Sequence, residues 1–372
     1  MSQTISGRLV LDDRIASGVV IVDDGLITDV DVRARGIAAR APFIAPGFVD
    51  VHVHGWGGHD AMGDRAALDG MARALLRHGV TSFLPTAVTA PISTLADFAA
   101  QVRAWAHTAP DDGAQPLGFN LEGPFLSPER KGAHDPALLR VPADVTRREL
   151  APLTDQLRVI TIAPELPGAL ELITWLGARG VAVSIGHSAA TVAQARAGYE
   201  AGATSTTHLF NAMSGVDHRA PGVAVAALLD DEAFTELIAD GVHVDRALWP
   251  LITRLKRADR LLAVSDAISL AGTGDGRGRV GTLDVEVRGK RVTLAGTSTL
   301  AGSVLSLDVA VRNLVESGVP LPDAVAAASR NPIALLGVTD RGRIASSLRA
   351  DLVELAPDLS VKRVMRAGQW QD

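Results

Sequence analysis

Histidine and carboxylate side chains close several short apolar runs of this 372-residue sequence. The runs include FVDVHVH, FNLEGP, VSIGHS, TTHLFNAM and LLAVSDA, and the polar residue comes at or near the end of each. The candidates for chemistry found in this way are His52, His54, Glu122, His187, His208, His243 and Asp266. Imidazole and carboxylate groups together suit a divalent ion of the zinc or iron class. The pattern therefore predicts a metal site assembled from strand ends.

Each of these histidines also has a simpler explanation, because a single histidine at a strand end often only packs and hydrogen-bonds. His52 and His54 are two residues apart, and the period of a strand directs both rings to the same side. Several such residues at matching positions favour a shared ligand set over independent packing roles.

The elements that must position these residues are eight apolar runs between residues 48 and 267, which alternate with stretches of helical periodicity. Strands that alternate with helices predict a parallel sheet of the α/β class, and eight such units predict a (β/α)8 TIM barrel. Reactive groups of such barrels lie at the carboxyl ends of the strands. All the candidate side chains are therefore expected to point into one mouth.

The two ends of the chain follow a different pattern, with short strands separated by turns such as Asp24-Gly25. We expect residues 1–47 and 345–372 to combine as a small β-sandwich domain and residues 48–344 to form the catalytic barrel. After the last barrel strand we expect a β-hairpin insertion around Arg288-Gly289 and then a helix that starts near Ser303.

The composition excludes several kinds of site and partner. The sequence contains no cysteine, so a metal must be held by His, Asp and Glu. The net charge of -6 is modest and the charges are interspersed, so we expect no nucleic-acid partner. No run approaches the roughly 20 apolar residues of a spanning helix, and the N-terminus does not look like a signal peptide. We therefore expect a cytoplasmic protein without a membrane partner.

The order and spacing of the motifs resemble those of N-acetylglucosamine-6-phosphate deacetylases of the amidohydrolase superfamily. The resemblance rests on GFVDVHVHGWGG, LEGPF, KGAH, SIGHS, THLFNAM, HRAPG, DGVH and SDA, and it covers essentially the whole chain. It implies a metal-dependent hydrolase that converts N-acetyl-D-glucosamine 6-phosphate to D-glucosamine 6-phosphate and acetate. Some other members of the superfamily bridge two metals with a carbamylated lysine, but none of the four lysines of this chain ends a predicted barrel strand.

The resemblance also implies roles for the metal ligands. Glu122, His187 and His208 match the residues that hold the main ion. His52 and His54 match a pair that binds a second ion in some members, with Glu122 as the bridge. One or two divalent ions of the zinc, iron, manganese or cobalt class are therefore expected per subunit.

A catalytic base and a substrate site are implied in the same way. Asp266 matches the residue that takes a proton from water and passes it to the departing amine, and a metal ligand or a structural hydrogen-bond acceptor is the alternative role. Arg219 matches the arginine that binds the sugar phosphate, which suits its planar fork of donors. The implied substrate-binding residues are Ala133, His134, Asn211, Ala212, Arg219, His243, Leu300, Ala301 and Gly302.

The expected partner is a small amino sugar phosphate, and the expected assembly is a homodimer or a higher homo-oligomer. His218, Arg219 and His243 are the candidates for a site shared between subunits. Alternative functions are an N-acetylgalactosamine-6-phosphate deacetylase, a deaminase that releases ammonia, and a non-catalytic barrel that assembles with partners. Retention of the full ligand set argues against the non-catalytic barrel.

Overall fold

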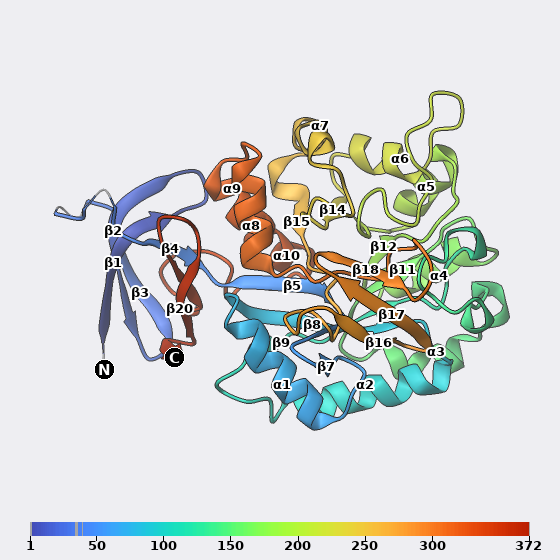
Figure 1. Cartoon of the computed structure of the whole chain (residues 1–372), viewed down its shortest axis with the longest axis horizontal. Coiled ribbons are helices and arrows are strands. Elements are labelled where there is room, and N and C mark those ends of the chain that lie inside the picture. The colour runs from blue at the N-terminus through green and yellow to red at the C-terminus, as the bar shows by residue number, and fades with distance from the viewer. Residues whose placement is uncertain (1, 34–35, 39, 372) are drawn as a thin grey trace.

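The computed structural model describes residues 2–33, 36–38 and 40–371, and Figure 1 shows a barrel beside a smaller body of strands. Within these residues, eight parallel strands pair in the order β15-β14-β13-β12-β11-β10-β8-β5. Their bounds are β5 (Phe48–Val53), β8 (Val80–Val88), β10 (Phe119–Glu122), β11 (Leu157–Ile162), β12 (Ala182–Ile185), β13 (Ser205–Thr206), β14 (Phe234–Leu237) and β15 (Leu261–Ala263). The prediction of a (β/α)8 barrel is confirmed.

Helices separate the barrel strands along the chain and surround them in space (Figure 1). The first begins after Asp64, whose side chain accepts a hydrogen bond from Ala67 N and so caps the helix. The helices are α1 (Arg65–Leu76), α2 (Ile92–Ala106), α3 (Arg147–Thr154), α4 (Ala169–Gly177), α5 (Val192–Glu200), α6 (Val223–Leu229), α7 (Trp249–Leu255), α8 (Leu307–Glu316), α9 (Leu321–Ala327) and α10 (Arg330–Leu335). Their apolar faces pack on the strands and form one large core.

The barrel closes where β5 meets the segment that follows β15. His54 N donates to the carbonyl oxygen of Ala267 at 2.8 Å, and Asp266 N donates to that of His52 at 2.9 Å. The residues predicted to carry chemistry therefore also close the barrel, which fixes their backbone on both sides.

A three-stranded antiparallel sheet follows the last barrel strand and lies in front of the barrel in Figure 1. It consists of β16 (Gly276–Val280), β17 (Leu283–Arg288) and β18 (Arg291–Leu294), and the predicted turn at Arg288-Gly289 joins the last two. The expected helix start near Ser303 is wrong, because α8 begins at Leu307. Ser303 instead donates its hydroxyl to Ser265 O and its backbone N to Asp266 O, which holds it in an extended segment.

Strands from both ends of the chain form one sheet in the order β21-β20-β19-β4-β1-β2-β3. Their bounds are β1 (Gln3–Val10), β2 (Ile15–Asp23), β3 (Leu26–Asp31), β4 (Phe43–Pro46), β19 (Leu352–Leu355), β20 (Val361–Arg366) and β21 (Gln369–Gln371). Asp24 and Gly25 have φ values of 48° and 77°, so the predicted hairpin turn is present. The division of the chain into two domains at residues 47 and 345 stays a prediction.

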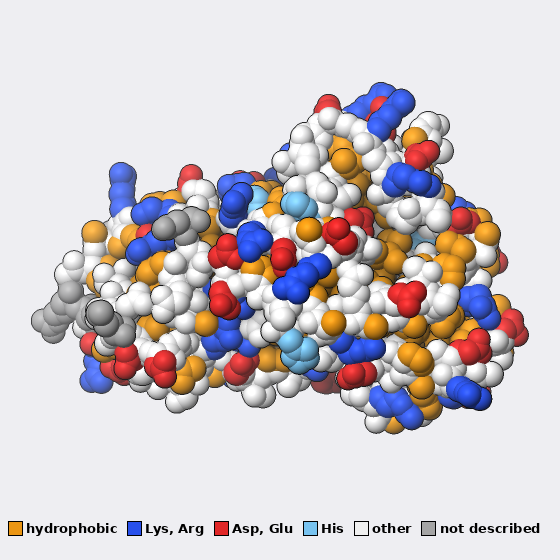
Figure 2. Space-filling model, turned by 90° about the horizontal axis from the view of Figure 1, so that it is seen from below, with side chains coloured by type: hydrophobic (Ala, Val, Ile, Leu, Met, Phe, Trp, Pro, Cys, Tyr) orange, Lys and Arg blue, Asp and Glu red, His pale blue; other side chains and the backbone are white. Residues whose placement is uncertain are grey.

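The surface carries charges of both signs. On the face drawn in Figure 2, Lys and Arg side chains are interspersed with Asp and Glu side chains. In the part of the chain that the structure describes, no helix combines the length and the apolar character needed to cross a bilayer.

Candidate active site

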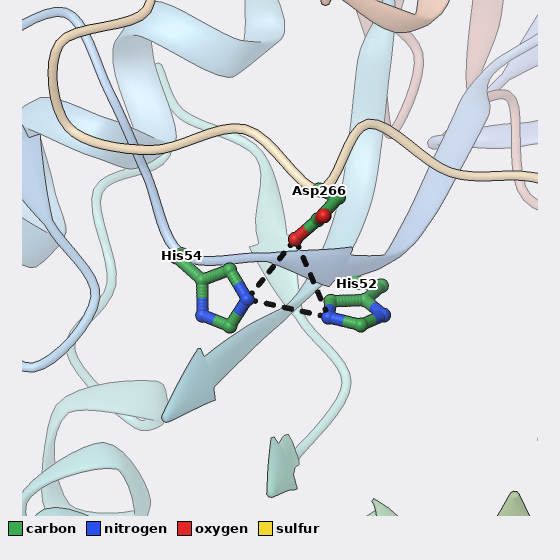
Figure 3. Close-up of side chains that lie close together, drawn as sticks. All are labelled: His52, His54 and Asp266. Atoms are coloured by element: carbon green, nitrogen blue, oxygen red, sulfur yellow. Dashed lines mark hydrogen bonds and ion pairs between the residues drawn. The ribbon is translucent and has the colours of Figure 1, made fainter. Parts of the chain in front are cut away.

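The first group joins the predicted ligands His52 and His54, at the end of β5, to the predicted base Asp266, in the segment after β15. His52, His54 and Asp266 point toward one another in Figure 3. His54 Nε2 lies 3.2 Å from Asp266 Oδ1, and His52 Nε2 lies 3.6 Å from the same oxygen. The two Nε2 atoms are 3.2 Å apart. This group therefore offers two nitrogens and one oxygen to a common point.

The second group joins the first through Glu122, the last residue of β10. Glu122 Oε1 lies 2.9 Å from Nε2 of both His187 and His208, and these two nitrogens are 3.1 Å apart. The other oxygen, Oε2, lies 3.3 Å from His54 Nε2. Glu122 thus faces both groups, as a bridging carboxylate must.

The backbone at three of these positions is unusual. His187, His208 and Asp266 have φ values of 47°, 23° and 50°, in a region that residues other than glycine rarely adopt. Each of the three comes just after a barrel strand. Such strained conformations persist where surrounding contacts determine them, and they cluster at functional sites.

The hydrogen bonds behind the histidines indicate what the site can hold. Nδ1 of His187 faces the carbonyl oxygen of Arg130 at 3.0 Å, and Nδ1 of His54 faces that of Thr86 at 3.1 Å. A carbonyl oxygen only accepts, so we infer that Nδ1 carries the hydrogen and that Nε2 of each neutral ring presents a lone pair. These lone pairs face the oxygens of Glu122. Nitrogen lone pairs and carboxylate oxygens that face one another have no hydrogen to share. This arrangement fits a divalent cation bound between them.

The electrostatics of the site also favour positive charge. Burial alone lowers the pKa of His52, but the carboxylates of Glu236 and Glu122 outweigh it and raise that pKa well above its usual value. Burial opposes the charge of His54 as well, yet hydrogen bonds to Asp266 and Glu122 raise its pKa to about 9. Burial raises the pKa of Asp266, but the His54 hydrogen bond and the charge of His52 bring it down to about 2. The carboxylate of Asp266 therefore stays ionised.

A cavity of about 340 Å³ opens onto these ligands, which is within the size range of small-molecule sites. Eight of the nine predicted substrate-binding residues line it: Ala133, His134, Asn211, Ala212, His243, Leu300, Ala301 and Gly302. The sequence did not point to its apolar wall, which consists of Val88, Phe210, Ile268 and Val280. The cavity therefore combines a polar floor of metal ligands with an apolar side.

Two of the predicted substrate contacts are held by neighbours. His134 Nε2 lies 3.2 Å from Glu122 Oε2, and its Nδ1 accepts from Thr89 N at 3.4 Å. His243 Nδ1 lies 2.7 Å from Asp240 Oδ2. Both rings are thus oriented before a ligand arrives.

Arg219, the predicted phosphate contact, does not line this cavity. It lies exposed on the loop that follows Ala212, and its backbone N donates to Asp217 Oδ1. The base of the loop is closed by a hydrogen bond from Gly222 N to Gly215 O. Among the residues that the structure describes, no Lys or Arg side chain lines the cavity. A phosphate bound there would meet no Lys or Arg side chain among the described lining residues.

Two buried carboxylates of the site were not among the predicted residues. Glu236 Oε2 lies 3.0 Å from His52 Nδ1, and Asp50 Oδ1 accepts from His52 N at 3.2 Å. Burial raises the pKa of Asp50 to about 7. Asp50 alternates along one strand with His52 and His54, so the period-2 pattern could have identified it.

Comparison with known proteins agrees with this geometry. Residues 43–371 match the amidohydrolase family. The chain belongs to the amidohydrolase family. Its resemblance to N-acetylglucosamine-6-phosphate deacetylases is confirmed by curated relatives. One is the human N-acetylglucosamine-6-phosphate deacetylase, which is 40% identical over 389 residues that cover 98% of this chain and 93% of the relative.

A second relative is the N-acetylgalactosamine-6-phosphate deacetylase of Escherichia coli O157:H7, 40% identical over 366 residues that cover 96% of this amidohydrolase and 95% of the relative. Among solved structures, the N-acetylglucosamine-6-phosphate deacetylase of Thermotoga maritima has a TM-score of 0.92 and 34% identity, and the similarity covers 100% of this chain and 99% of that one. A mutant of the Mycobacterium smegmatis enzyme in complex with N-acetyl-D-glucosamine-6-phosphate has a TM-score of 0.90 and 37% identity, with 99% of each chain covered.

Proposed function

We propose that this protein hydrolyses N-acetyl-D-glucosamine 6-phosphate to D-glucosamine 6-phosphate and acetate. The observation that carries the proposal is the pair of ligand groups joined by Glu122 at the floor of a cavity of sugar size. Relatives that cover nearly the whole chain support the substrate class. The same relatives make a deaminase or a non-catalytic barrel unnecessary as explanations.

The proposed main ion ligands are Glu122, His187 and His208, and the proposed second group is His52, His54 and Asp266. A bound divalent ion of the zinc, iron, manganese or cobalt class would activate water and polarise the acetyl carbonyl. Both groups together have room for one or two ions per chain.

Asp266 is the proposed general base. It lines the cavity, and its carboxylate is ionised at neutral pH, as a proton acceptor must be. After accepting a proton from the attacking water, it can return it to the sugar nitrogen, which then leaves as an amine. His134 also lines the cavity, where its ring can contact the acetyl group or the sugar.

The phosphate is proposed to bind Arg219 from a second copy of the chain, in a homodimer. No Lys or Arg side chain lines the cavity among the described residues, whereas Arg219 lies exposed on a loop next to the cavity. Val216, on this loop, is 63% exposed, and Leu229, at the end of the helix that follows the loop, is 57% exposed. These exposed apolar side chains support a contact with a second copy here.

The experiment that tests the activity is acetate release from N-acetylglucosamine 6-phosphate by purified protein, with the metal content determined on the same sample. Turnover should disappear on chelation and return when the metal is restored. A metal-loaded sample that releases no acetate would contradict the proposed substrate.

A second candidate substrate is N-acetylgalactosamine 6-phosphate, since the relative from Escherichia coli O157:H7 carries that name. The two sugars differ only in the orientation of one hydroxyl group. Competition between the two epimers, followed by acetate release, separates these candidates through the ratio of kcat/KM values. The expected cytoplasmic location stays a prediction.

A further inference from the structure

Glu236 lies behind the first ligand group, in the middle of β14, and its side chain is 1% exposed. Its Oε2 atom has two partners. One is His52 Nδ1 at 3.0 Å, and the other is the backbone N of His208 at 3.1 Å. A single carboxylate oxygen therefore contacts one residue from each ligand group.

The burial of this carboxylate requires an explanation. Glu236 Oε1 is buried and has no hydrogen-bond partner among the residues that the structure describes. Within the same part of the chain, no Lys or Arg side chain forms an ion pair with Glu236, and the ionisable side chain in contact with it is His52. A buried carboxylate is costly unless it is paired with positive charge. The ligand groups directly in front of His52 are where such charge would be held.

The contact also determines which nitrogen of His52 can bind an ion. A carboxylate accepts hydrogen bonds, so Nδ1 of His52 donates to Glu236, and in the neutral ring, which is the form that binds a metal, Nε2 keeps its lone pair. That Nε2 lies 3.2 Å from His54 Nε2 and 3.5 Å from Glu122 Oε1. A carboxylate behind a ligating histidine also makes the ring a stronger donor.

We infer that Glu236 is a positioning residue that fixes the tautomer and orientation of His52 for a second metal ion and ties His208 into the same arrangement. The inference rests on the proposed function only in taking the two groups as metal ligands. In this role Glu236 acts through His52 and needs no contact with the substrate.

The test measures ion binding, so it does not depend on turnover. Metal-free wild type, E236L, E236Q and T235V are titrated with Zn²⁺ against a competing chelator, and folding is checked by circular dichroism. E236L keeps the bulk but removes the acceptor, whereas E236Q keeps an oxygen that can accept from His52. Thr235→Val is the matched control, because Thr235 is the buried neighbour on β14 and its hydroxyl has no partner in the described structure.

Wild type should bind two ions. E236L should lose about 10- to 100-fold in affinity for one of them, E236Q should lose less than E236L, and T235V should match wild type. Equal affinities in E236L and wild type, or an equal loss in E236L and T235V, would overturn the inference. So would a wild type that binds only one ion at saturation.

A spectroscopic measurement covers the case in which E236L does not fold. The side-chain ¹⁵N signals of His52 should report a protonated Nδ1 and an unprotonated or metal-bound Nε2 in wild type and in E236Q. A protonated Nε2 in metal-loaded wild type would overturn the inference. Loss of acetate release with normal ion binding would instead point to a failure of the proposed function.

Discussion

The position of Arg219 leads to a prediction about subunit complementation. R219A should lose activity on the phosphorylated sugar because, in the described structure, no Lys or Arg side chain lines the cavity and could replace Arg219. D266N should be inactive because its cavity lacks the proposed base. If the loop of one subunit completes the cavity of the other, a heterodimer of the two variants has one intact site, formed by Asp266 of the R219A chain and Arg219 of the D266N chain.

The expected magnitudes follow from this arrangement. Loss of a charge-assisted pair of hydrogen bonds to phosphate costs roughly 2–4 kcal/mol, or about 30- to 700-fold in kcat/KM for R219A. When equal amounts of the two variants are mixed and exchange subunits at random, about half of the dimers are mixed and each has one intact site. Acetate release should then recover to about one quarter of the wild-type rate per chain.

The assay compares acetate release by each variant alone with that of the mixture after unfolding and refolding together. Recovery far above the sum of the two variants supports a shared site. A mixture that never exceeds this sum, although mixed dimers are detected by mass, would refute the reasoning and leave Arg219 to act within its own chain. Arg148→Ala, an exposed arginine on α3, is the control and should behave as wild type.

Three further predictions concern the base, the second ion and stability. Asp266→Asn should lose about 10²- to 10⁴-fold in kcat but keep the ion at Glu122, and unchanged turnover would exclude Asp266 as the base. His52→Ala should remove one ion per chain by elemental analysis, and loss of all bound metal would show that the two groups depend on each other. Burial lowers the pKa of Lys256 from 10.5 to about 8, so the native state binds fewer protons than the unfolded state between these pH values and stability should rise with pH there. The free energy of unfolding in urea, relative to Lys256→Met, should therefore increase between about pH 8 and about pH 10.5, and a constant difference would contradict this.

The positions of polar residues at the ends of apolar runs predicted the site, because parallel strands of a barrel present their carboxyl ends at one mouth. Glu122 ends β10 and His52 and His54 end β5 or follow it directly, as the apolar runs indicated. The alternation of strands and helices was equally informative, since each run of apolar residues is buried between helices and the neighbouring strands.

Residues that do not close an apolar run could not be found in this way. In the sequence, Glu236 is the first residue of the stretch ELIADGVH, so it does not close an apolar run, and β14 begins two residues earlier at Phe234. The residue is therefore inside a strand, and its partner His52 is 184 positions away. The placement of Arg219 outside the cavity depends on the conformation of a loop, which apolar periodicity does not specify. Ser303 has a residue type that favours helix caps, but tertiary hydrogen bonds hold it elsewhere.

The mixed sheet formed by the two ends of the chain has a consequence for synthesis on the ribosome. β4 pairs with β1 on one side, but its other partner, β19, begins about 300 residues later. At translation rates of about 5–20 residues per second, one edge of β4 waits roughly 15 to 60 s for its partner. Unpaired edges are prone to join other strands. The synthesis of β19 therefore decides whether β4 of a nascent chain is protected from aggregation, and ribosome stalling before β19 is made should produce insoluble fragments.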